Sequence, residues 1–253
     1  MVNQLINAFK NLPQVEAIAL GGSRSGTNFD NNSDYDIYLY ITDPIPEAVR
    51  REIYEKYCSA VEIGNHFWEY EDNGRLLDGI DFDILYRNLD DFSAGIKDVV
   101  EGHQAHNGYT TCMWHNLLTC KILYDRDGRL TIAKNRFNVP YPSALKANII
   151  NRNHKLLTGT FPCYQDQIEK AVKRGDLISI NHRVAAFLES YFDILFALNE
   201  QTHPGEKRLI SLCMERCNLL PAHFEENLKS LFDDRENTCD VIRRIIAELE
   251  KIL

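Results

Sequence analysis

The sequence predicts an α+β protein: a mixed sheet flanked by helices in the N-terminal part, followed by an all-helical C-terminal domain. Short apolar runs typical of strands alternate with helical stretches over residues 1–140. Pro140 and Pro142 interrupt this pattern, and beyond them the apolar residues recur at helical spacing. We therefore expect two domains, residues 1–140 and residues 141–253.

Three segments of the N-terminal domain predict strands: 15–22 (VEAIALGG), 35–41 (YDIYLYI) and 79–87 (GIDFDILYR). Each is an apolar run that begins or ends at polar turn residues. Apolar and acidic residues alternate in the third, so one face would be buried and the other polar. The glycine-containing stretch 69–79 (EYEDNGRLLDG) is interpreted as a turn that leads into this third strand.

Four longer segments predict helices. The first, 46–61, starts with a proline and has apolar residues at helical spacing. A second is expected from about 144 to 157, with Ser143 as its N-cap. Residues 176–199 predict a central and largely buried helix, because both of its sides are rich in apolar residues. Residues 238–253 predict a final amphipathic helix.

The composition is that of a folded protein with an acidic surface. Of 253 residues, 44% are hydrophobic and 26% are charged, which excludes a disordered chain, and the net charge is −9. Because proteins that grip a nucleic-acid backbone usually have a basic face, we expect no long nucleic acid as a partner.

The same sequence shows no sign of a membrane or of an oxidising compartment. No apolar run approaches the ~20 residues of a membrane-spanning helix, and no signal peptide is recognised. The seven cysteines include no Cys-x-x-Cys pair and fit reduced thiols. We therefore expect a cytoplasmic protein without a membrane partner.

Two aspartates stand at the beginning of the second predicted strand. Asp34 and Asp36 are two residues apart, so in an extended strand both side chains project from the same face. Like charges placed in this way repel each other and call for a cation. Mg²⁺ takes one or two carboxylates and completes its shell with water and substrate phosphates, so this pair predicts a magnesium site.

The loop before these aspartates predicts a phosphate-binding turn. Gly21 and Gly22 allow the backbone to turn tightly after the first strand, and Ser23 presents a hydroxyl and backbone N–H groups there. Arg24 could assist in binding phosphate. Alone, either motif is more typical of a surface turn or of solvated strand-end charges. Together, between two apolar strands, they favour a site for a metal ion and nucleotide phosphates.

A third carboxylate would complete such a site, and the third predicted strand offers two. Asp81 and Asp83 lie on its polar face. Asp83 lies deeper in the apolar run, where an unpaired charge costs most, so we favour Asp83 and keep Asp81 as its substitute. Trp68, which precedes this strand in the sequence, is expected to line either an acceptor pocket or the core.

Positive charge for a triphosphate could come from two further places. Lys207 and Arg208 follow a Pro-Gly turn at the expected start of a helix, where they either bind phosphate or are solvated. Arg87 is a weaker candidate, because an ion pair with Asp90 or Asp91 is more typical of a strand end.

These motifs resemble the nucleotidyltransferase superfamily that includes DNA polymerase beta. The resemblance lies in GGSRSG, in DYD twelve residues after Gly22, and in a following apolar strand with another aspartate. More narrowly, the chain resembles the small bacterial aminoglycoside and lincosamide nucleotidyltransferases and relatives with a helical C-terminal domain. The segments that carry this narrower resemblance are DILYR, CKILYDRDG, YPSAL and ALNEQTHPGEKRLI.

The resemblance implies a role for each matching residue. Gly22 and Ser23 match the phosphate-binding turn, Asp34 and Asp36 match the paired metal ligands, and Asp83 matches the third acid, which binds metal and helps to deprotonate the acceptor. It implies two Mg²⁺ ions and an NTP, with ATP as the first choice. The expected activity is transfer of NMP to a hydroxyl of a small molecule, such as an aminoglycoside- or lincosamide-like antibiotic.

Two alternatives remain open at this stage. The acceptor could be a protein side chain or a tRNA end, as in toxin–antitoxin relatives, or the protein could be a nucleotide-binding regulator without turnover. The doubled acid at Asp81 and Asp83 departs from the family pattern and leaves the third carboxylate open.

Overall fold

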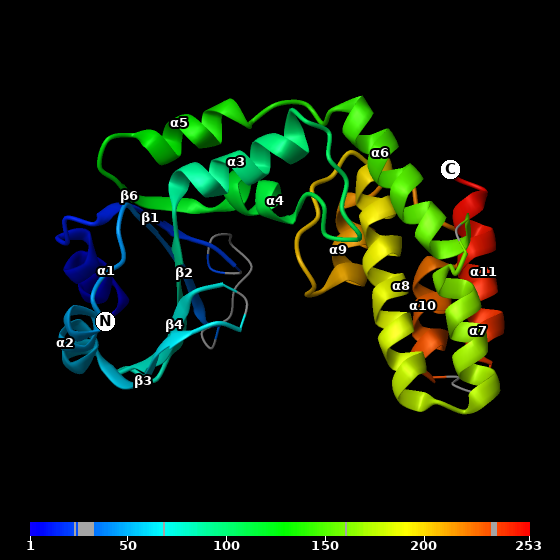
Figure 1. Ribbon diagram of the computed structural model, residues 1–253, viewed down its shortest axis with the longest axis horizontal. Coiled ribbons are helices and arrows are strands. Elements are labelled where there is room, and N and C mark those ends of the chain that lie inside the picture. The colour runs from blue at the N-terminus through cyan, green and yellow to red at the C-terminus, as the bar shows by residue number, and fades with distance from the viewer. Residues whose placement is uncertain (23, 25–32, 68, 160, 234–236) are drawn as a thin grey trace. The chain divides into compact units, whose positions relative to one another are not determined.

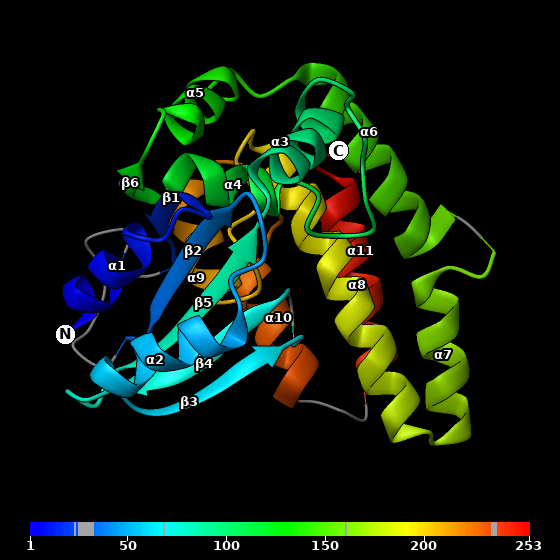
Figure 2. The same ribbon diagram turned by 60° about the vertical axis from the view of Figure 1, so that its left-hand side comes forward.

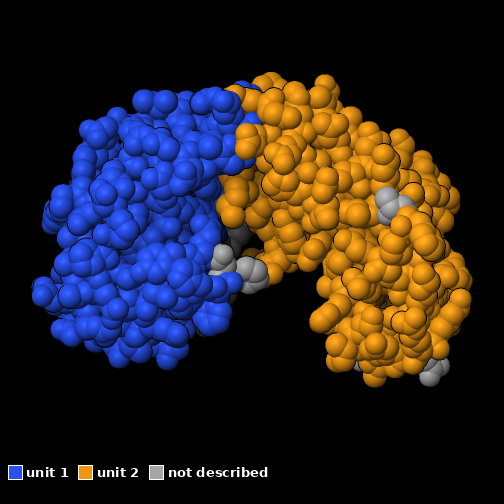
Figure 3. All heavy atoms as spheres, in the orientation of Figure 1, with its two compact units in different colours: residues 1–97, 116–139 blue, residues 98–115, 140–253 orange. Residues whose placement is uncertain are grey.

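The computed structural model describes residues 1–22, 24, 33–67, 69–159, 161–233 and 237–253. The chain forms two compact units (Figure 3). Unit 1 comprises Met1–Lys97 and Asn116–Val139, and unit 2 comprises Asp98–His115 and Pro140–Leu253. The predicted α+β class is confirmed, since unit 1 contains a mixed sheet with helices and unit 2 is helical. Residues 98–115, which we assigned to the first domain, are part of unit 2.

Unit 1 is built on one sheet, which has six strands among the described residues, in the order β3-β4-β5-β2-β1-β6 (Figure 1). Neighbouring strands β2 and β5 are parallel, whereas the other neighbours are antiparallel. The strands are β1 (Val15–Leu20), β2 (Tyr35–Ile41), β3 (Cys58–Asn65), β4 (Glu71–Leu76), β5 (Asp81–Arg87) and β6 (Lys121–Asp125).

Helices cover the two faces of this sheet differently. Helices α1 (Val2–Lys10) and α2 (Glu47–Tyr57) pack on one face through an apolar core that includes Leu5, Phe9 and Ile53 (Figure 2). The alternation in β5 places Phe82 and Ile84 in this core. Unit 1 also contains α5 (Arg129–Arg136) and parts of α3 (Leu89–Val100) and α4 (Cys112–Thr119).

The opposite face of the sheet carries the acidic residues of β2 and β5. Farther along β2 on this face, Tyr40 packs its ring on Phe92 of α3, with 5.6 Å between the ring centroids. Tyr38 accepts a 2.7 Å hydrogen bond from Asn116 of α4. These contacts cover one end of the face, so that the acidic end remains partly exposed.

The hairpin β3–β4 was not predicted. The expected helix 46–61 ends at Tyr57, where β3 begins, and the expected turn 69–79 contains β4. The strand forms despite its polar sequence because Asp72 is enclosed on the core side. Its carboxylate accepts hydrogen bonds from Arg50, from Tyr54 and Tyr86 at 2.7 Å each, and from the backbone N–H of Gly64 at 2.7 Å.

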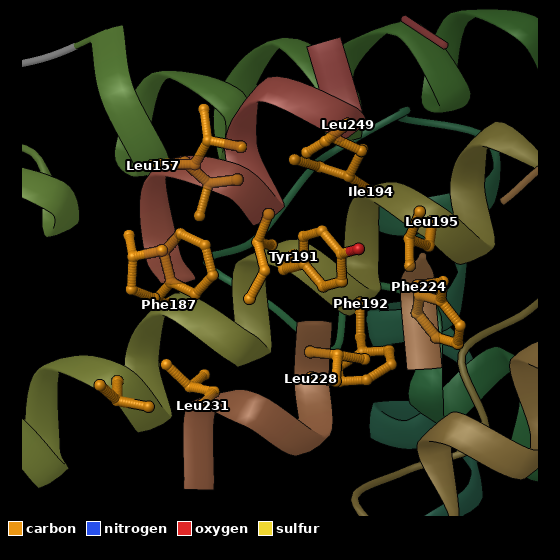
Figure 4. Close-up of a cluster of buried hydrophobic side chains, with 14 of the residues drawn as sticks. Leu157, Phe187, Tyr191, Phe192, Ile194, Leu195, Phe224, Leu228, Leu231 and Leu249 are labelled. Atoms are coloured by element: carbon orange, nitrogen blue, oxygen red, sulfur yellow. The ribbon is translucent and has the colours of Figure 1, made fainter. Parts of the chain in front are cut away.

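Unit 2 is a helical domain around the 22-residue helix α8 (Leu177–Leu198), whose predicted extent is confirmed. Figure 4 shows its core, where Phe187, Tyr191 and Phe192 of α8 lie among leucines of neighbouring helices. The other helices are α6 (Ser143–His154), the π-helical turn η2 (Lys155–Gly159), α7 (Tyr164–Arg174), α9 (Leu209–Arg216), α10 (Phe224–Asp233) and α11 (Thr238–Glu250). Ser143 is the first residue of α6, with Pro142 as N-cap, so the predicted serine cap is wrong.

A buried polar cluster holds residues 98–115 to the rest of unit 2. Asp193 of α8 is 1% exposed and accepts hydrogen bonds from the backbone N–H of Thr110 at 3.0 Å and from its hydroxyl at 2.6 Å. Asn153 of α6 donates a further bond to it at 3.1 Å. This cluster explains why the segment belongs to unit 2, because a buried carboxylate needs these donors.

Candidate functional site

The two glycines after β1 lie directly against β2. The N–H of Gly21 donates a 2.8 Å hydrogen bond to the carbonyl of Asp36, and a Cβ on Gly21 would lie 2.2 Å from the Tyr38 ring. Gly22 has φ +57°, and a Cβ there would lie 1.7 Å from Oδ2 of Asp36. A side chain at either position would therefore collide with β2 side chains as they stand, and the left-handed backbone at Gly22 also favours glycine.

Asp36 and Asp83 face each other across neighbouring strands. They are direct partners in the parallel register of β2 and β5, where strands run about 4.8 Å apart. Residues paired in this way project from the same face, and both side chains are partly exposed. Asp34 lies one residue before β2 and is exposed. The fold thus brings together two acids that are 47 positions apart in the chain.

The two acids of β5 have different partners. Asp81 is paired with Arg75 of β4, whose Nε and Nη2 donate hydrogen bonds of 2.6 and 3.1 Å to its two oxygens. This contact with Arg75 lowers the pKa of Asp81 below its ordinary value. Asp83 instead accepts a 2.7 Å hydrogen bond from the side-chain amide of Asn73. A guanidinium thus neutralises Asp81, whereas Asp83 receives a neutral donor.

Arg24 lies at the beginning of β2. Its Nε donates a 2.5 Å hydrogen bond to the carbonyl of Ser33, and its guanidinium lies over the ring of Tyr35, 4.1 Å from the centroid. Tyr35 and Asp36 project from opposite faces of the strand, so these contacts place Arg24 next to the strand that carries Asp36 but do not pair it with the two acids. The predicted residues Ser23 and Trp68 lie outside the described residues.

The basic candidates of the sequence analysis belong to both units, Lys207 and Arg208 to unit 2 and Arg87 to unit 1. Lys207 and Arg208 are exposed in unit 2, in the turn directly before α9. Arg87 is 6% exposed and donates two hydrogen bonds to Glu69, at 2.8 and 2.6 Å. The expected ion pair of Arg87 with Asp90 or Asp91 is wrong.

Sequence reasoning missed Asn73, because it lies in the stretch read as a turn. Asn73 is the partner of Asp83 in the register of β4 and β5, and its side-chain oxygen accepts a hydrogen bond from Asn65 of β3. The sequence carries no strand signal at this point, since residues 71–74 (EDNG) show no alternation of apolar and polar side chains.

The donor set can be compared with the requirements of a metal ion. Among the described residues, no three His, Cys, Asp or Glu side chains are grouped closely enough to hold a metal ion. Two neighbouring carboxylates, Asp36 and Asp83, nevertheless fit Mg²⁺, which needs only one or two from the protein. The backbone of Gly22 lies directly against the Asp36 carboxylate, so the glycine turn after β1 adjoins the acidic pair.

Two further observations bear on the whole chain. None of the helices in its described part combines the length and apolar character needed to cross a membrane. All seven cysteines lie in described segments and are free thiols.

Comparisons with known proteins give three results. A family model described as a domain of unknown function, DUF4037, matches residues 109–209, which is less than half of the chain. A comparison with curated proteins finds no match.

Similar solved structures include a nucleotidyltransferase-like protein and an aminoglycoside adenyltransferase. One is a nucleotidyltransferase-like protein from Exiguobacterium sibiricum 255-15, with a TM-score of 0.45, 11% identity, and coverage of 99% of this chain and 72% of that chain. Another is an aminoglycoside 6-adenyltransferase from Bacillus subtilis, with a TM-score of 0.31, 12% identity, and coverage of 99% and 89%.

Proposed function

We propose that this protein is a Mg²⁺-dependent nucleotidyltransferase that moves NMP from an NTP, with ATP as the first choice, to a hydroxyl of a small molecule. One observation carries the proposal: Asp36 and Asp83 are in register on neighbouring strands, and Gly22 approaches Asp36 so closely that no side chain fits between them. Paired acids beside a glycine turn are the elements that bind metal and phosphate.

Asp36 and Asp83, together with Asp34, would hold two Mg²⁺ ions. Bound there, Mg²⁺ would supply neutralisation of the triphosphate charge and a lower pKa for the acceptor hydroxyl. Asp81 is a poorer ligand than Asp83, because its charge is already matched by two hydrogen bonds from Arg75.

The reaction is an in-line substitution at the α-phosphorus of the NTP. The acceptor oxygen forms a bond to this phosphorus, and the bond from the phosphorus to the oxygen that bridges to the β-phosphate breaks. Pyrophosphate leaves with that electron pair, and Asp83 takes the hydroxyl proton. Charge that builds up on the phosphates would be met by the backbone N–H groups at Gly22 and Ser23 and by Arg24.

Lys207 and Arg208 remain proposed as a further source of positive charge for the triphosphate. Both are exposed, so their side chains are accessible to an anion. Lysine and arginine differ here, since arginine can bind a phosphate through two parallel hydrogen bonds.

The acceptor is proposed to be a cationic small molecule, such as an aminoglycoside- or lincosamide-like compound. The net charge of −9 attracts cationic ligands and disfavours a long nucleic acid. Seven free thiols suit a reducing compartment, so a cytoplasmic location is proposed as well.

The test is calorimetric titration of ATP, GTP, CTP and UTP in the presence of Mg²⁺. Wild type should bind one NTP, and Asp36→Asn and Asp83→Asn should each lose that binding. Asp81→Asn is the matched control, since it removes a charge from the same face of the same strand, and it should bind as wild type does. Wild-type protein that binds no NTP would overturn the proposal.

Analysis of the reaction products distinguishes the remaining hypotheses about function. Pyrophosphate release that depends on Mg²⁺ distinguishes an enzyme from a nucleotide-binding regulator. Transfer of label from the NTP to a small molecule, rather than to protein or tRNA, identifies the acceptor class.

A further inference from the structure

We propose that Asn73 positions the carboxylate of Asp83 for the transfer reaction. This inference rests on the proposed function, because it assigns a role to a residue that acts through Asp83. Asn73 lies on β4, in the hairpin that the sequence did not predict.

The contacts of Asn73 fix its side chain at both ends. Its Nδ2 donates a hydrogen bond of 2.7 Å to Oδ1 of Asp83, and its Oδ1 accepts a hydrogen bond from Nδ2 of Asn65. A carboxylate can only accept, so Asp83 requires the nitrogen of the Asn73 amide on its side. The bond from Asn65 requires the oxygen on the other side. The amide therefore cannot flip without losing both hydrogen bonds.

These side chains form one row across the sheet. In register, Asn73 of β4 is paired with Asp83 of β5, and Asp83 is paired with Asp36 of β2. Because β4 and β2 flank β5 on opposite sides, Asn73 and Asp36 lie on opposite sides of Asp83. The hydrogen bond from Asn73 holds Oδ1 of Asp83 on the side away from Asp36 and thereby sets the direction of Oδ2.

A neutral donor suits this role better than a cation. Arg75, two residues farther along the same face of β4, donates two hydrogen bonds to Asp81 of β5 and thereby matches its charge. The Asn73 amide orients its aspartate and leaves the negative charge available for a cation or a proton. The same two strands thus hold one aspartate that is neutralised and one that is oriented.

The test compares Asn73→Ala with Arg75→Ala, a matched control that removes a hydrogen bond between the same two strands. The first readout is binding of Mn²⁺ alone by calorimetry, and the second is pyrophosphate release with the NTP selected above. Asn73→Ala should weaken Mn²⁺ binding about 10-fold, as is typical when an outer partner of a metal ligand is lost. It should lower kcat by about 10-fold, with a smaller change in KM. Arg75→Ala should neither weaken Mn²⁺ binding nor lower kcat, since it removes no hydrogen bond to Asp83.

Asp83→Asn separates failure of the inference from failure of the proposed function. Loss of Mn²⁺ binding in Asp83→Asn, with wild-type behaviour of Asn73→Ala, would overturn the positioning role alone. Wild-type Mn²⁺ binding and pyrophosphate release in Asp83→Asn would overturn both. Equal losses in Asn73→Ala and Arg75→Ala would also overturn the positioning role, since they would show a general effect of loosening β4. Thermal unfolding of each variant verifies that it is folded.

Discussion

Each of the two compact units buries an aspartate, and the two are stabilised in different ways. Asp72 in unit 1 is 0% exposed and lies against the guanidinium of Arg50, with two tyrosine hydroxyls and a backbone N–H as further donors. Asp193 in unit 2 is 1% exposed and is hydrogen-bonded by neutral donors, Thr110 and Asn153. Both carboxylates are thus hydrogen-bonded, and Asp72 also has a cation partner, Arg50.

The two kinds of partner, neutral donors and a charged partner, have different effects on the pKa values of the buried groups. Burial raises the pKa of Asp193 to about 6, although hydrogen bonds from Thr110 and Asn153 act in the opposite direction. Arg50 is affected differently: burial alone would lower its pKa, but Asp72 raises it above its ordinary value. A cation partner therefore compensates for the loss of water around a buried charge, which neutral donors do only in part.

The acids of the proposed site form a third case. Asp36 and Asp83 are partly exposed, lie side by side, and are approached by a glycine backbone and a neutral amide. Asp72 lies on the core face of the same sheet and stabilises the hairpin. Asp72, a structural acid, is enclosed by donors, whereas the acids of the proposed site keep their charge accessible.

The largest effect is expected from Asp72→Ala. The variant leaves the buried guanidinium of Arg50, 3% exposed, without its carboxylate. Breaking a buried pair in this way costs about 3–5 kcal/mol of the free energy of unfolding, measured by urea denaturation. Asp36→Asn is the contrasting variant, which should lose NTP binding without such a loss of stability. A loss below about 1 kcal/mol for Asp72→Ala would show that the buried pair is not structural.

The buried Asp193 should make stability depend on pH. Its folded-state pKa of about 6 lies above the ordinary value of 3.8, so the folded state binds the proton more tightly. The resulting stabilisation is fully present below pH 3.8 and is lost as the pH rises through about 6. It amounts to about 3 kcal/mol, from a shift of about 2 units at 1.36 kcal/mol each.

A comparison of Asp193→Asn with wild type separates the contribution of Asp193 to the pH dependence of stability from the contribution of the buried histidines. Burial lowers the pKa of His115 to about 4 and that of His203 to about 3, so both destabilise the fold as the pH falls below 6.5. These effects are common to wild type and variant and cancel in their difference. We expect the stability of Asp193→Asn relative to wild type to increase from about pH 4 to pH 7. A difference that stays constant with pH would contradict the raised pKa.

Gly22→Ala should weaken NTP binding as well as stability. Alanine at φ +57° costs about 1–2 kcal/mol, and its Cβ would displace the carboxylate of Asp36. Because that carboxylate is the end of a flexible side chain, it can rotate, and NTP binding should fall at least about 10-fold. Gly79→Ala is the matched control, since Gly79 also has a positive φ, +87°, but no atom within 4 Å of a Cβ. Equal NTP binding by both variants would contradict a role for Gly22 at the site.

The smallest effect is expected from Arg75→Ala. Arg75 and Asp81 form an ion pair in which both side chains are about half exposed, and such pairs contribute little to stability. The midpoint of urea unfolding should therefore match that of wild type within error. A clear decrease would show that this edge of the sheet depends on the pair, and the control in the test of Asn73 would then have to be replaced.

Parts of the fold followed from local patterns alone. The apolar runs of β1, β2 and β5 and the long helix α8 were predicted, because burial imposes a period of two on a strand and of 3.6 on a helix. The hairpin β3–β4 was not, because its residues 71–74 (EDNG) are typical of a turn. Arg50, Tyr54 and Tyr86, which enclose Asp72, come from other elements, and no local pattern shows this.

For the candidate site, short segments of the sequence encode the types of residue: a glycine turn, paired aspartates and an acidic strand. Which of these residues meet depends on the fold. The register of β2 against β5 places Asp83 beside Asp36, and the register of β4 assigns Arg75 to Asp81 and Asn73 to Asp83. Strand register is set by packing of the whole sheet, since a slip of one residue would turn every side chain to the opposite face.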